Sequence, residues 1–263
     1  MNLHQRILTY NDCYLRGQTI RPRGVMVHST GAKNPNLSRY VGPDDGLLGQ
    51  NPNNNHWNMS GVGACVHAFI GRLADGSIAS YQTLPWNWRG WHCGSGRNGS
   101  ANNTHMSFEI CEDGLDDPEY FQAVYQEAVE LTAYLCELYG LDPLEDGVVI
   151  CHQEGYRRGV ASNHADVLHW FPKFGKSMDD FRRDVDKIMR GEDTVTQEQF
   201  DAMLENWLER KAAEPADDWA KPYIDRAIDA GAMSDVGGTI ASPKSFITRQ
   251  EVAVVVSALA KQE

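Results

Sequence analysis

The strongest structural signal in the sequence is a helical segment at residues 118–140, PEYFQAVYQEAVELTAYLCELYG. Apolar side chains recur through it at the spacing that places them on one face of a helix. Asp117 is suited to cap its N-terminus, Pro118 fits the first helical position, and Gly140 suits the C-terminal end. We expect this helix to serve as scaffold rather than to carry chemistry.

Five apolar runs around this helix are typical of β-strands. They are residues 25–30 (VMVHST), the two arms of a hairpin with an Asp-Gly turn at 64–83, residues 106–112, and residues 148–155. A further helix is predicted from Met178 to Met189, with Ser177 as its N-cap. The sequence therefore predicts an α/β fold with a mixed central β-sheet flanked by helices.

The chain length and a break in the pattern predict two parts. A chain of 263 residues can form a domain of ordinary size plus a small module. We expect a catalytic domain at residues 1–190, a linker at 191–195 and a small helical module at 196–263. The module would contain one helix at 196–212 and, after a break, two more helices around a loop rich in Gly, Ser and Pro, too few residues for a large core of its own.

The charge balance argues against several classes of partner. The formal net charge is −12, and no cluster of Lys and Arg stands out, so nucleic acid and anionic membrane surfaces are disfavoured. No window reaches the roughly 18 apolar residues of a membrane span. The first residues lack the apolar core of a signal peptide, so we expect a protein made in the cytoplasm.

The six cysteines are scattered without a CxxC spacing, and several lie inside apolar runs. We therefore expect reduced core residues rather than disulfides. Cys151 adjoins His152, which raises a metal-binding or nucleophilic role for its thiol. In a strand the two side chains point in opposite directions, so we favour His152 alone as the functional residue.

Polar groups stand at or just beyond the ends of the predicted strands. His28 ends the first strand, His152 follows an apolar strand, and Asp166 lies in the segment HAD shortly afterwards. Two histidines and one aspartate, with a free fourth position, are typical of a catalytic zinc site. Glu109 lies in mid-strand among apolar residues, where burial would raise its pKa, so it is a candidate general base.

Aromatic residues in two polar loops form a further candidate group. Trp57 lies in the loop at 31–63, whereas Trp88, Trp91 and His92 lie in the loop at 85–105. Exposed aromatic rings suit stacking against a sugar or a peptide, so all four are candidate substrate-binding residues. Tryptophan can equally anchor its own loop. We expect His67 and His169 to be packed or supporting histidines.

These motifs together resemble a known family. VMVHST, ACVHAFIGRLADGSIASYQTLPW, RGWHCG, MSFEIC, ICHQE and HADVLHW occur in the order seen in zinc-dependent N-acetylmuramoyl-L-alanine amidases. These type-2 amidases are related to peptidoglycan recognition proteins and to many phage endolysins. The resemblance covers about residues 20–172 and implies the same α/β architecture.

The resemblance also implies roles for individual residues. Zn²⁺ would be held by His28, His152 and Asp166, with Glu109 as the general base and His164 where the family often has a catalytic lysine. The sequence departs from the family pattern here, because His replaces Lys, Val replaces Pro after Asp166, and the gap from His152 to Asp166 is longer. His164 is therefore the alternative third ligand.

The implied activity is hydrolysis of the lactyl amide bond between N-acetylmuramic acid and L-alanine by zinc-activated water. The expected setting is a phage or prophage endolysin that reaches bacterial peptidoglycan after holin-type release. A host autolysin, or a peptidoglycan-binding protein without catalysis, is the alternative. The C-terminal segment resembles a single S-layer-homology repeat, which implies binding of a secondary cell-wall polymer, with self-association or a structural role as alternatives.

Overall fold

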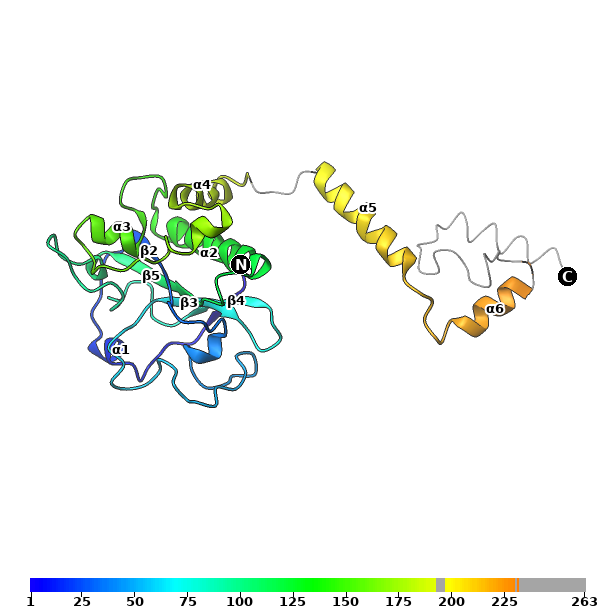
Figure 1. The fold of residues 1–263 in the computed structure, drawn as a ribbon, viewed down its shortest axis with the longest axis horizontal. Coiled ribbons are helices and arrows are strands. Elements are labelled where there is room, and N and C mark those ends of the chain that lie inside the picture. The colour runs from blue at the N-terminus through cyan, green and yellow to red at the C-terminus, as the bar shows by residue number, and fades with distance from the viewer. Residues whose placement is uncertain (193–196, 230, 232–263) are drawn as a thin grey trace. The chain divides into compact units, whose positions relative to one another are not determined.

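The computed structural model describes residues 1–192, 197–229 and 231. The chain divides into two units, Met1–Asp193 and Thr194–Glu263, and each is described by itself. Within the described residues, the first unit contains all the strands and helices α1 to α4, and the second contains helices α5 and α6 (Figure 1).

The first unit is built on a six-stranded sheet with the order β1-β4-β3-β5-β2-β6. Only β3 and β4 pair in antiparallel fashion, and all other neighbours are parallel. The predicted mixed sheet is therefore confirmed. The strands are β1 (Leu3–Gln5), β2 (Gly24–Ser29), β3 (Ala68–Arg72), β4 (Ile78–Gln82), β5 (His105–Ile110) and β6 (Val149–Cys151).

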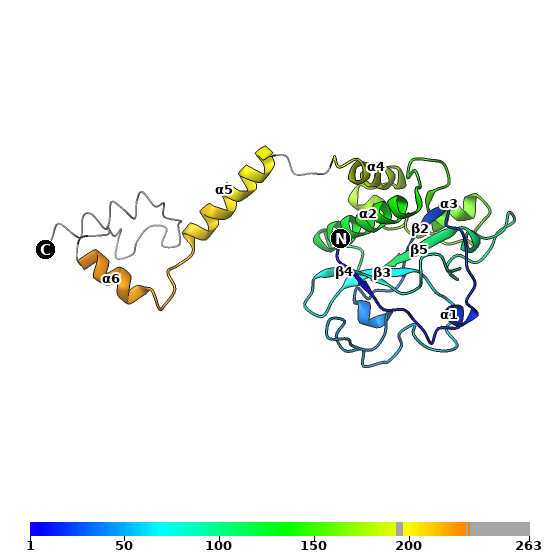
Figure 2. The same ribbon diagram turned by 180° about the vertical axis from the view of Figure 1, so that it is seen from behind.

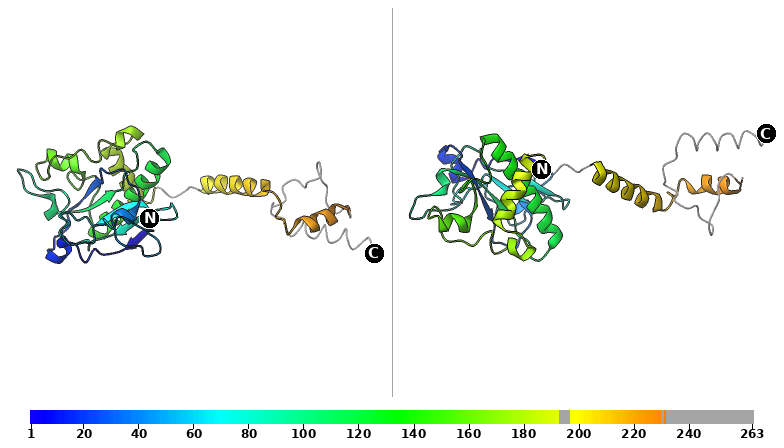
Figure 3. Two further views of the ribbon diagram at one scale, coloured as in Figure 1. Left: turned by 60° about the horizontal axis from the view of Figure 1, so that its bottom comes forward. Right: turned by 90° about the horizontal axis from the view of Figure 1, so that it is seen from above.

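Helices cover one face of this sheet, and long polar loops lie on the other side (Figures 1 and 2). The covering helices α2 and α4 lie side by side when seen from above (Figure 3). The helices of this unit are α1 (Asp12–Arg16), α2 (Pro118–Tyr139), α3 (His152–Arg157) and α4 (Met178–Met189), with 3-10 turns at Leu37–Arg39, Ala101–Asn103 and Phe171–Phe174.

The main core lies between α2 and the sheet. Met106, Phe108 and Ile110 point from β5 into this core, as the alternation of the strand requires. Glu109 therefore faces the opposite side. Helix α2 starts after Asp117, whose carboxylate accepts two backbone N–H groups, and ends at Gly140 in the left-handed conformation. All six cysteines are buried as free thiols.

One predicted strand is shorter than expected. The run at residues 148–155 was predicted as continuous strand, but β6 stops at Cys151 and helix α3 begins at His152. The Glu154 carboxylate accepts the backbone N–H of Cys151 at 3.1 Å, which stabilises the start of a helix. Cysteine is not a usual cap, so the sequence did not reveal this start. His152 therefore lies just beyond the carboxyl end of β6, at the first position of α3.

His67 holds three segments of this unit together. Its Nδ1 accepts the backbone N–H of Ser107 at 3.0 Å, so Nε2 carries the proton and donates to the Trp88 carbonyl at 2.8 Å. The ring is fully buried, and burial lowers its pKa to about 4. This arrangement agrees with the expected packed histidine and requires the neutral ring.

The free energy of unfolding should fall as the pH drops because of His67. A histidine whose pKa is lower in the folded state stabilises the fold above its ordinary pKa of 6.5, and this contribution is lost as the pH falls towards about 4. The loss is on the order of 3 kcal/mol at most. We expect urea unfolding between pH 7 and 4.5 to show a shallower pH dependence for His67→Gln. An unchanged slope would contradict this role.

The second unit contains α5 (Gln197–Ala213) and α6 (Lys221–Asp229). Both fall where the sequence predicted helices. The third predicted helix and the loop before it lie outside the described residues, so the resemblance to an S-layer-homology repeat stays a prediction. No helix in the described ranges combines the length and apolar character needed to cross a bilayer.

Candidate metal centre

The site forms where neighbouring parallel strands end. Strand β2 lies between β5 and β6, and His28 pairs with Glu109 in the register of β2 and β5. His152 follows β6 directly, and Asp166 comes from the loop after α3. Carboxyl ends of parallel strands collect at one edge of a sheet, which is why residues so distant in sequence meet.

Three side chains converge closely enough to hold one metal ion. The Oδ2 atom of Asp166 lies 3.0 Å from Nδ1 of His28 and 3.5 Å from Nδ1 of His152, and the two Nδ1 atoms are 3.1 Å apart. Ligands bound tetrahedrally at about 2.1 Å would lie roughly 3.4 Å from one another. His28, His152 and Asp166 thus fit a single Zn²⁺-sized ion with a position left open.

Outer hydrogen bonds orient both imidazole rings. Nε2 of His28 lies 2.9 Å from Nδ1 of His92, and Nε2 of His152 lies 3.3 Å from Oγ of Ser162. The Ser162 hydroxyl donates to the carbonyl of Cys93 at 3.1 Å, so its oxygen accepts from His152. Each ring can therefore carry its proton on Nε2 and present the Nδ1 lone pair to a metal.

The charge states of His28 and Asp166 also suit a metal. Burial lowers the pKa of His28 despite the adjacent Asp166 carboxylate. Burial alone would raise the pKa of Asp166, but the adjacent imidazole groups of His152 and His28 hold it well below its usual range. A neutral imidazole and an ionised carboxylate are the ligand forms that bind Zn²⁺.

Glu109 lies beside this set. Its Oε2 atom is buried and has no hydrogen-bond partner. Burial raises its pKa well above the ordinary value, and the negative charges of Asp166 and Glu112 raise it further. An unpartnered carboxylate oxygen at the wall of a hollow is free to exchange a proton with a bound molecule.

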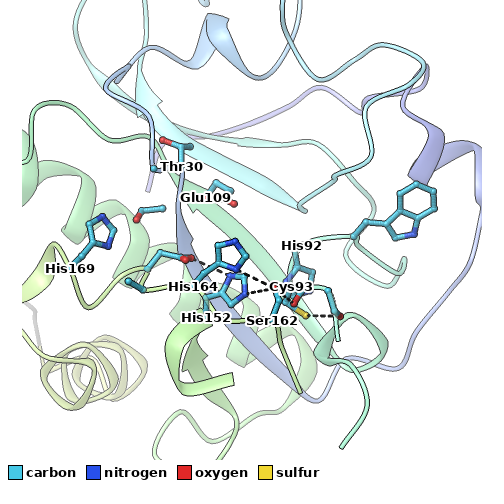
Figure 4. A pocket seen from close by; sticks show the side chains of 14 residues that line it. Thr30, His92, Cys93, Glu109, His152, Ser162, His164 and His169 are labelled. Atoms are coloured by element: carbon cyan, nitrogen blue, oxygen red, sulfur yellow. Dashed lines mark hydrogen bonds and ion pairs between the residues drawn. The ribbon is translucent and has the colours of Figure 1, made fainter. Parts of the chain in front are cut away.

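His164 lies next to the three converging groups rather than among them. Its ring centroid is 4.5 Å from that of His152, and its Nδ1 lies 3.1 Å from Oγ of Ser162 (Figure 4). The set whose ligand atoms lie within 4.8 Å of one another consists of His28, His152 and Asp166. The geometry thus favours Asp166 over His164 as the third ligand.

A hollow of about 510 Å³ opens onto this site. Glu109, His152 and His164 are among the residues that line it (Figure 4). Asp166 also lines it. The expected catalytic and metal-binding groups therefore share one cavity wall with His28 directly behind it. Its remaining walls come from the segments around Thr30, Trp91 and Ser162 and from His169.

Two of the four candidate aromatic residues line this hollow, and two do not. Trp91 and His92 are on its wall. Trp57 instead packs edge-on against Phe69, with ring centroids 4.9 Å apart, and Trp88 stacks on Tyr14 at 4.7 Å. Trp57 and Trp88 are half-buried and lie outside the lining of this hollow, so their contacts favour the alternative that each anchors its own loop, and substrate binding by Trp91 and His92 stays a prediction.

Sequence reasoning missed several supporting groups. Ser162 joins His152 and His164, but nothing distinguishes it from other serines in polar loops. Glu112 is buried and accepts the hydroxyl of Ser29 at 2.6 Å and faces Nε2 of His169 at 2.9 Å. The supporting role expected for His169 is consistent with this contact. The one sequence signal for Glu112 is its position at the end of the apolar run 106–112, where a second carboxylate follows Glu109.

The fold and the site together define a class of protein. A buried His/His/Asp set stands at the carboxyl edge of a mixed sheet, with an unpartnered carboxylate beside it and an open hollow in front. This is an arrangement suited to metal-assisted hydrolysis.

Comparison with known proteins identifies the family. The profile of the N-acetylmuramoyl-L-alanine amidase family matches residues 18–168, more than half of the chain, so the chain belongs to this family. The motifs quoted from the sequence thus pointed to the right family. None of the curated proteins matches.

Two solved structures are similar to this chain, and the first of them shares its fold. The hydrolase AmiA of Staphylococcus aureus, in complex with its ligand, has a TM-score of 0.52 at 20% identity and covers 72% of this chain and 83% of its own. A mutant endolysin from Bacillus subtilis has a TM-score of 0.46 at 22% identity and covers 70% of this chain and 99% of its own. At these identities the likeness concerns the fold alone.

Proposed function

We propose that this protein is a zinc-dependent N-acetylmuramoyl-L-alanine amidase that cleaves the lactyl amide bond of bacterial peptidoglycan. The observation that carries the proposal is the convergence of His28, His152 and Asp166 beside the unpartnered carboxylate of Glu109. This convergence occurs within a chain that belongs to the amidase family.

In this proposal one set of residues binds the metal ion and another residue transfers protons. His28, His152 and Asp166 would hold the ion, which when bound supplies a Lewis acid that acidifies a water molecule and polarises the amide carbonyl. Glu109 takes the proton of the attacking water and passes it to the departing amine of L-alanine. Its free Oε2 atom has no competing partner within the described chain.

We infer that His164 assists at the carbonyl oxygen of the substrate. Its Nδ1 lies 3.1 Å from the oxygen of Ser162, which already donates its own proton to Cys93, so Nδ1 of His164 carries a proton. Donation from Nε2 to the substrate oxygen therefore requires the protonated ring. In that form His164 would stabilise developing negative charge, as the lysine it replaces would.

Digestion of defined muropeptides tests the proposal directly. Mass analysis should show intact stem peptide released from N-acetylmuramic acid, with the glycan chain uncut. Products cut within the glycan or within the peptide would contradict it. A protein that bound cell walls without releasing either product would instead be a non-catalytic peptidoglycan-binding relative.

We also propose that the protein acts as an endolysin at the cell wall after holin-type release. The amidase family membership supports a wall substrate. Purified protein added from outside should lower the turbidity of isolated bacterial cell walls. Binding of a secondary wall polymer by residues 196–263 belongs to the same proposal and would appear as wall retention.

Replacing Ser162 should weaken zinc binding without removing a ligand. Ser162→Ala loses the acceptor that fixes Nε2–H of His152, so the affinity for Zn²⁺ should fall by about 10- to 100-fold. Ser162→Thr keeps the hydroxyl and should restore most of this affinity. Competition with a chromophoric chelator measures it, and Ser95→Ala, an exposed serine of the same region, is the matched control. Equal affinities for all variants would contradict the role.

A further inference from the structure

A second hollow lies beside the metal centre. Its volume is about 320 Å³, and Gly96, Arg97, Tyr156, Arg157, Gly159 and Ala161 line it. Ala161 is followed directly by Ser162 of the metal-site hollow, and Gly96 lies two residues beyond Gly94 of that same wall. The same two chain segments, around residues 93–97 and 159–162, therefore line both hollows.

The backbone around the second hollow is firmly held. A tight turn joins Gly96 and Gly99 through hydrogen bonds in both directions. Asn98 ties this turn to the end of α3, because its backbone N–H donates to Gly159 and its side chain donates to the carbonyl of Arg158. These hydrogen bonds fix the backbone of the turn that carries Arg97.

Glycine is needed where the turn and the helix end meet. A Cβ atom on Gly96 would lie 2.5 Å from the backbone of Gly159. A Cβ atom on Gly159, whose φ is +74°, would lie 2.8 Å from the side chain of Arg97. The side-chain stem of Arg97 therefore lies against Gly159, just after the end of α3, and Arg97 and Arg157 line the same hollow.

The charge of this hollow is unusual for the molecule. The protein carries a formal net charge of −12, yet both charged side chains on the wall are arginines. Neighbouring Arg158 is paired with Asp146, whereas no carboxylate within the described part of the chain pairs with Arg97 or Arg157. The two guanidinium groups without a carboxylate partner favour an anionic ligand. The exposed side chain of Tyr156 lines the same hollow.

We propose that this second hollow is a subsite that binds a free carboxylate on the peptide part of the substrate. The inference rests on the proposed amidase function, since the metal centre would hold the amide at the start of that peptide. Because the same two chain segments line both hollows, we infer that one substrate molecule extends from the metal centre to the two arginines. A planar carboxylate suits the fork of donors that each guanidinium offers.

Paired substrates test the subsite. Two muramoyl peptides are compared, one with a free C-terminal carboxylate and one with a C-terminal carboxamide. The zinc-loaded full chain should cleave the carboxylate form with a kcat/KM about five- to tenfold higher, since charge-assisted hydrogen bonds to exposed groups give modest gains. The double variant R97Q/R157Q should lose this preference while cleaving the carboxamide as wild type does. Arg16→Gln, an exposed arginine on α1, is the matched control.

Binding measured without cleavage separates this inference from the proposed function. Calorimetric titration of the full chain with the stem peptide alone should show the same carboxylate preference, again lost in R97Q/R157Q. If this preference appears but neither muramoyl peptide is cleaved, the amidase proposal fails and the subsite stands.

Two results would overturn the subsite. One is an undiminished carboxylate preference in R97Q/R157Q. The other is unchanged cleavage of both muramoyl peptides together with weaker retention on whole cell walls, which would assign the arginines to phosphate groups of a wall polymer.

Discussion

Glu109→Gln should lower kcat/KM for amide hydrolysis by about 10²- to 10⁴-fold, the usual contribution of a positioned general base. The amide has the shape of the carboxylate but cannot take a proton from the attacking water. Because Glu109 is not one of the three groups that converge on the metal position, zinc content should stay at one ion per chain. Single-turnover hydrolysis of a soluble muropeptide, with zinc measured on the same samples, checks both expectations.

The same substitution should not destabilise the metal-free protein. Burial raises the pKa of Glu109 above its ordinary value of 4.5, so above that pH the ionised form is less favourable in the folded state than in the unfolded state. At neutral pH the carboxylate therefore lowers the free energy of unfolding, and neutral Gln removes that cost. The Tm of Glu109→Gln should equal or exceed that of wild type. Such a trade between stability and activity is typical of catalytic groups.

Glu127 supplies the matched control. It is also a buried carboxylate, but it lies on α2 and accepts hydrogen bonds from the hydroxyl of Ser80 and the backbone N–H of Asn2. Glu127→Gln should therefore lower stability by about 1–3 kcal/mol and leave kcat unchanged. Wall lysis by Glu109→Gln at the wild-type rate would show that another group is the base.

Much of the site could be predicted because it lies on regular structure. His28 and Glu109 stand on strands whose alternation is visible in the sequence, and the carboxyl ends of parallel strands must meet. His152 was found for the same reason, although the strand before it ends sooner than the pattern suggested. A period of two residues fixes which side chains share a face without any knowledge of distant contacts.

The remaining part of the site lies in loops, which have no regular alternation of side chains from which contacts could be predicted. The roles of Ser162 and Trp57 follow from long-range contacts, with Cys93 in one case and Phe69 in the other. Nothing local in a Gly- and Asn-rich loop predicts such partners. The start of α3 was missed because its cap is a cysteine backbone held by Glu154, not one of the usual capping side chains.

Asp166→Ala should abolish tight zinc binding and hydrolysis together, whereas His164→Ala should keep the zinc. Asp166 supplies the oxygen that lies 3.0 Å and 3.5 Å from the two Nδ1 atoms of the histidines. Its removal takes away both a ligand and the only charge that would balance the ion within this set. The affinity should therefore fall by more than the roughly 10- to 100-fold typical of an outer partner.

His164→Ala separates the two roles left open by the sequence. Its ring lies against His152 and is bonded to Ser162, outside the converging set. We therefore expect a normal zinc content with a kcat reduced by about 10²- to 10³-fold, the scale of one lost donor to the developing charge. His28→Ala, which removes a ligand on β2, should behave like Asp166→Ala.

Thermal unfolding gives a readout that does not depend on activity. An ion that binds only the folded state stabilises it by about 2.7 kcal/mol when its concentration is 100 times the Kd. A chelator should therefore lower the Tm of wild type and of His164→Ala but leave that of Asp166→Ala unchanged. If His164→Ala lost this response and Asp166→Ala kept it, the third ligand would be His164, and Asp166 would instead be an outer partner that orients the two histidines.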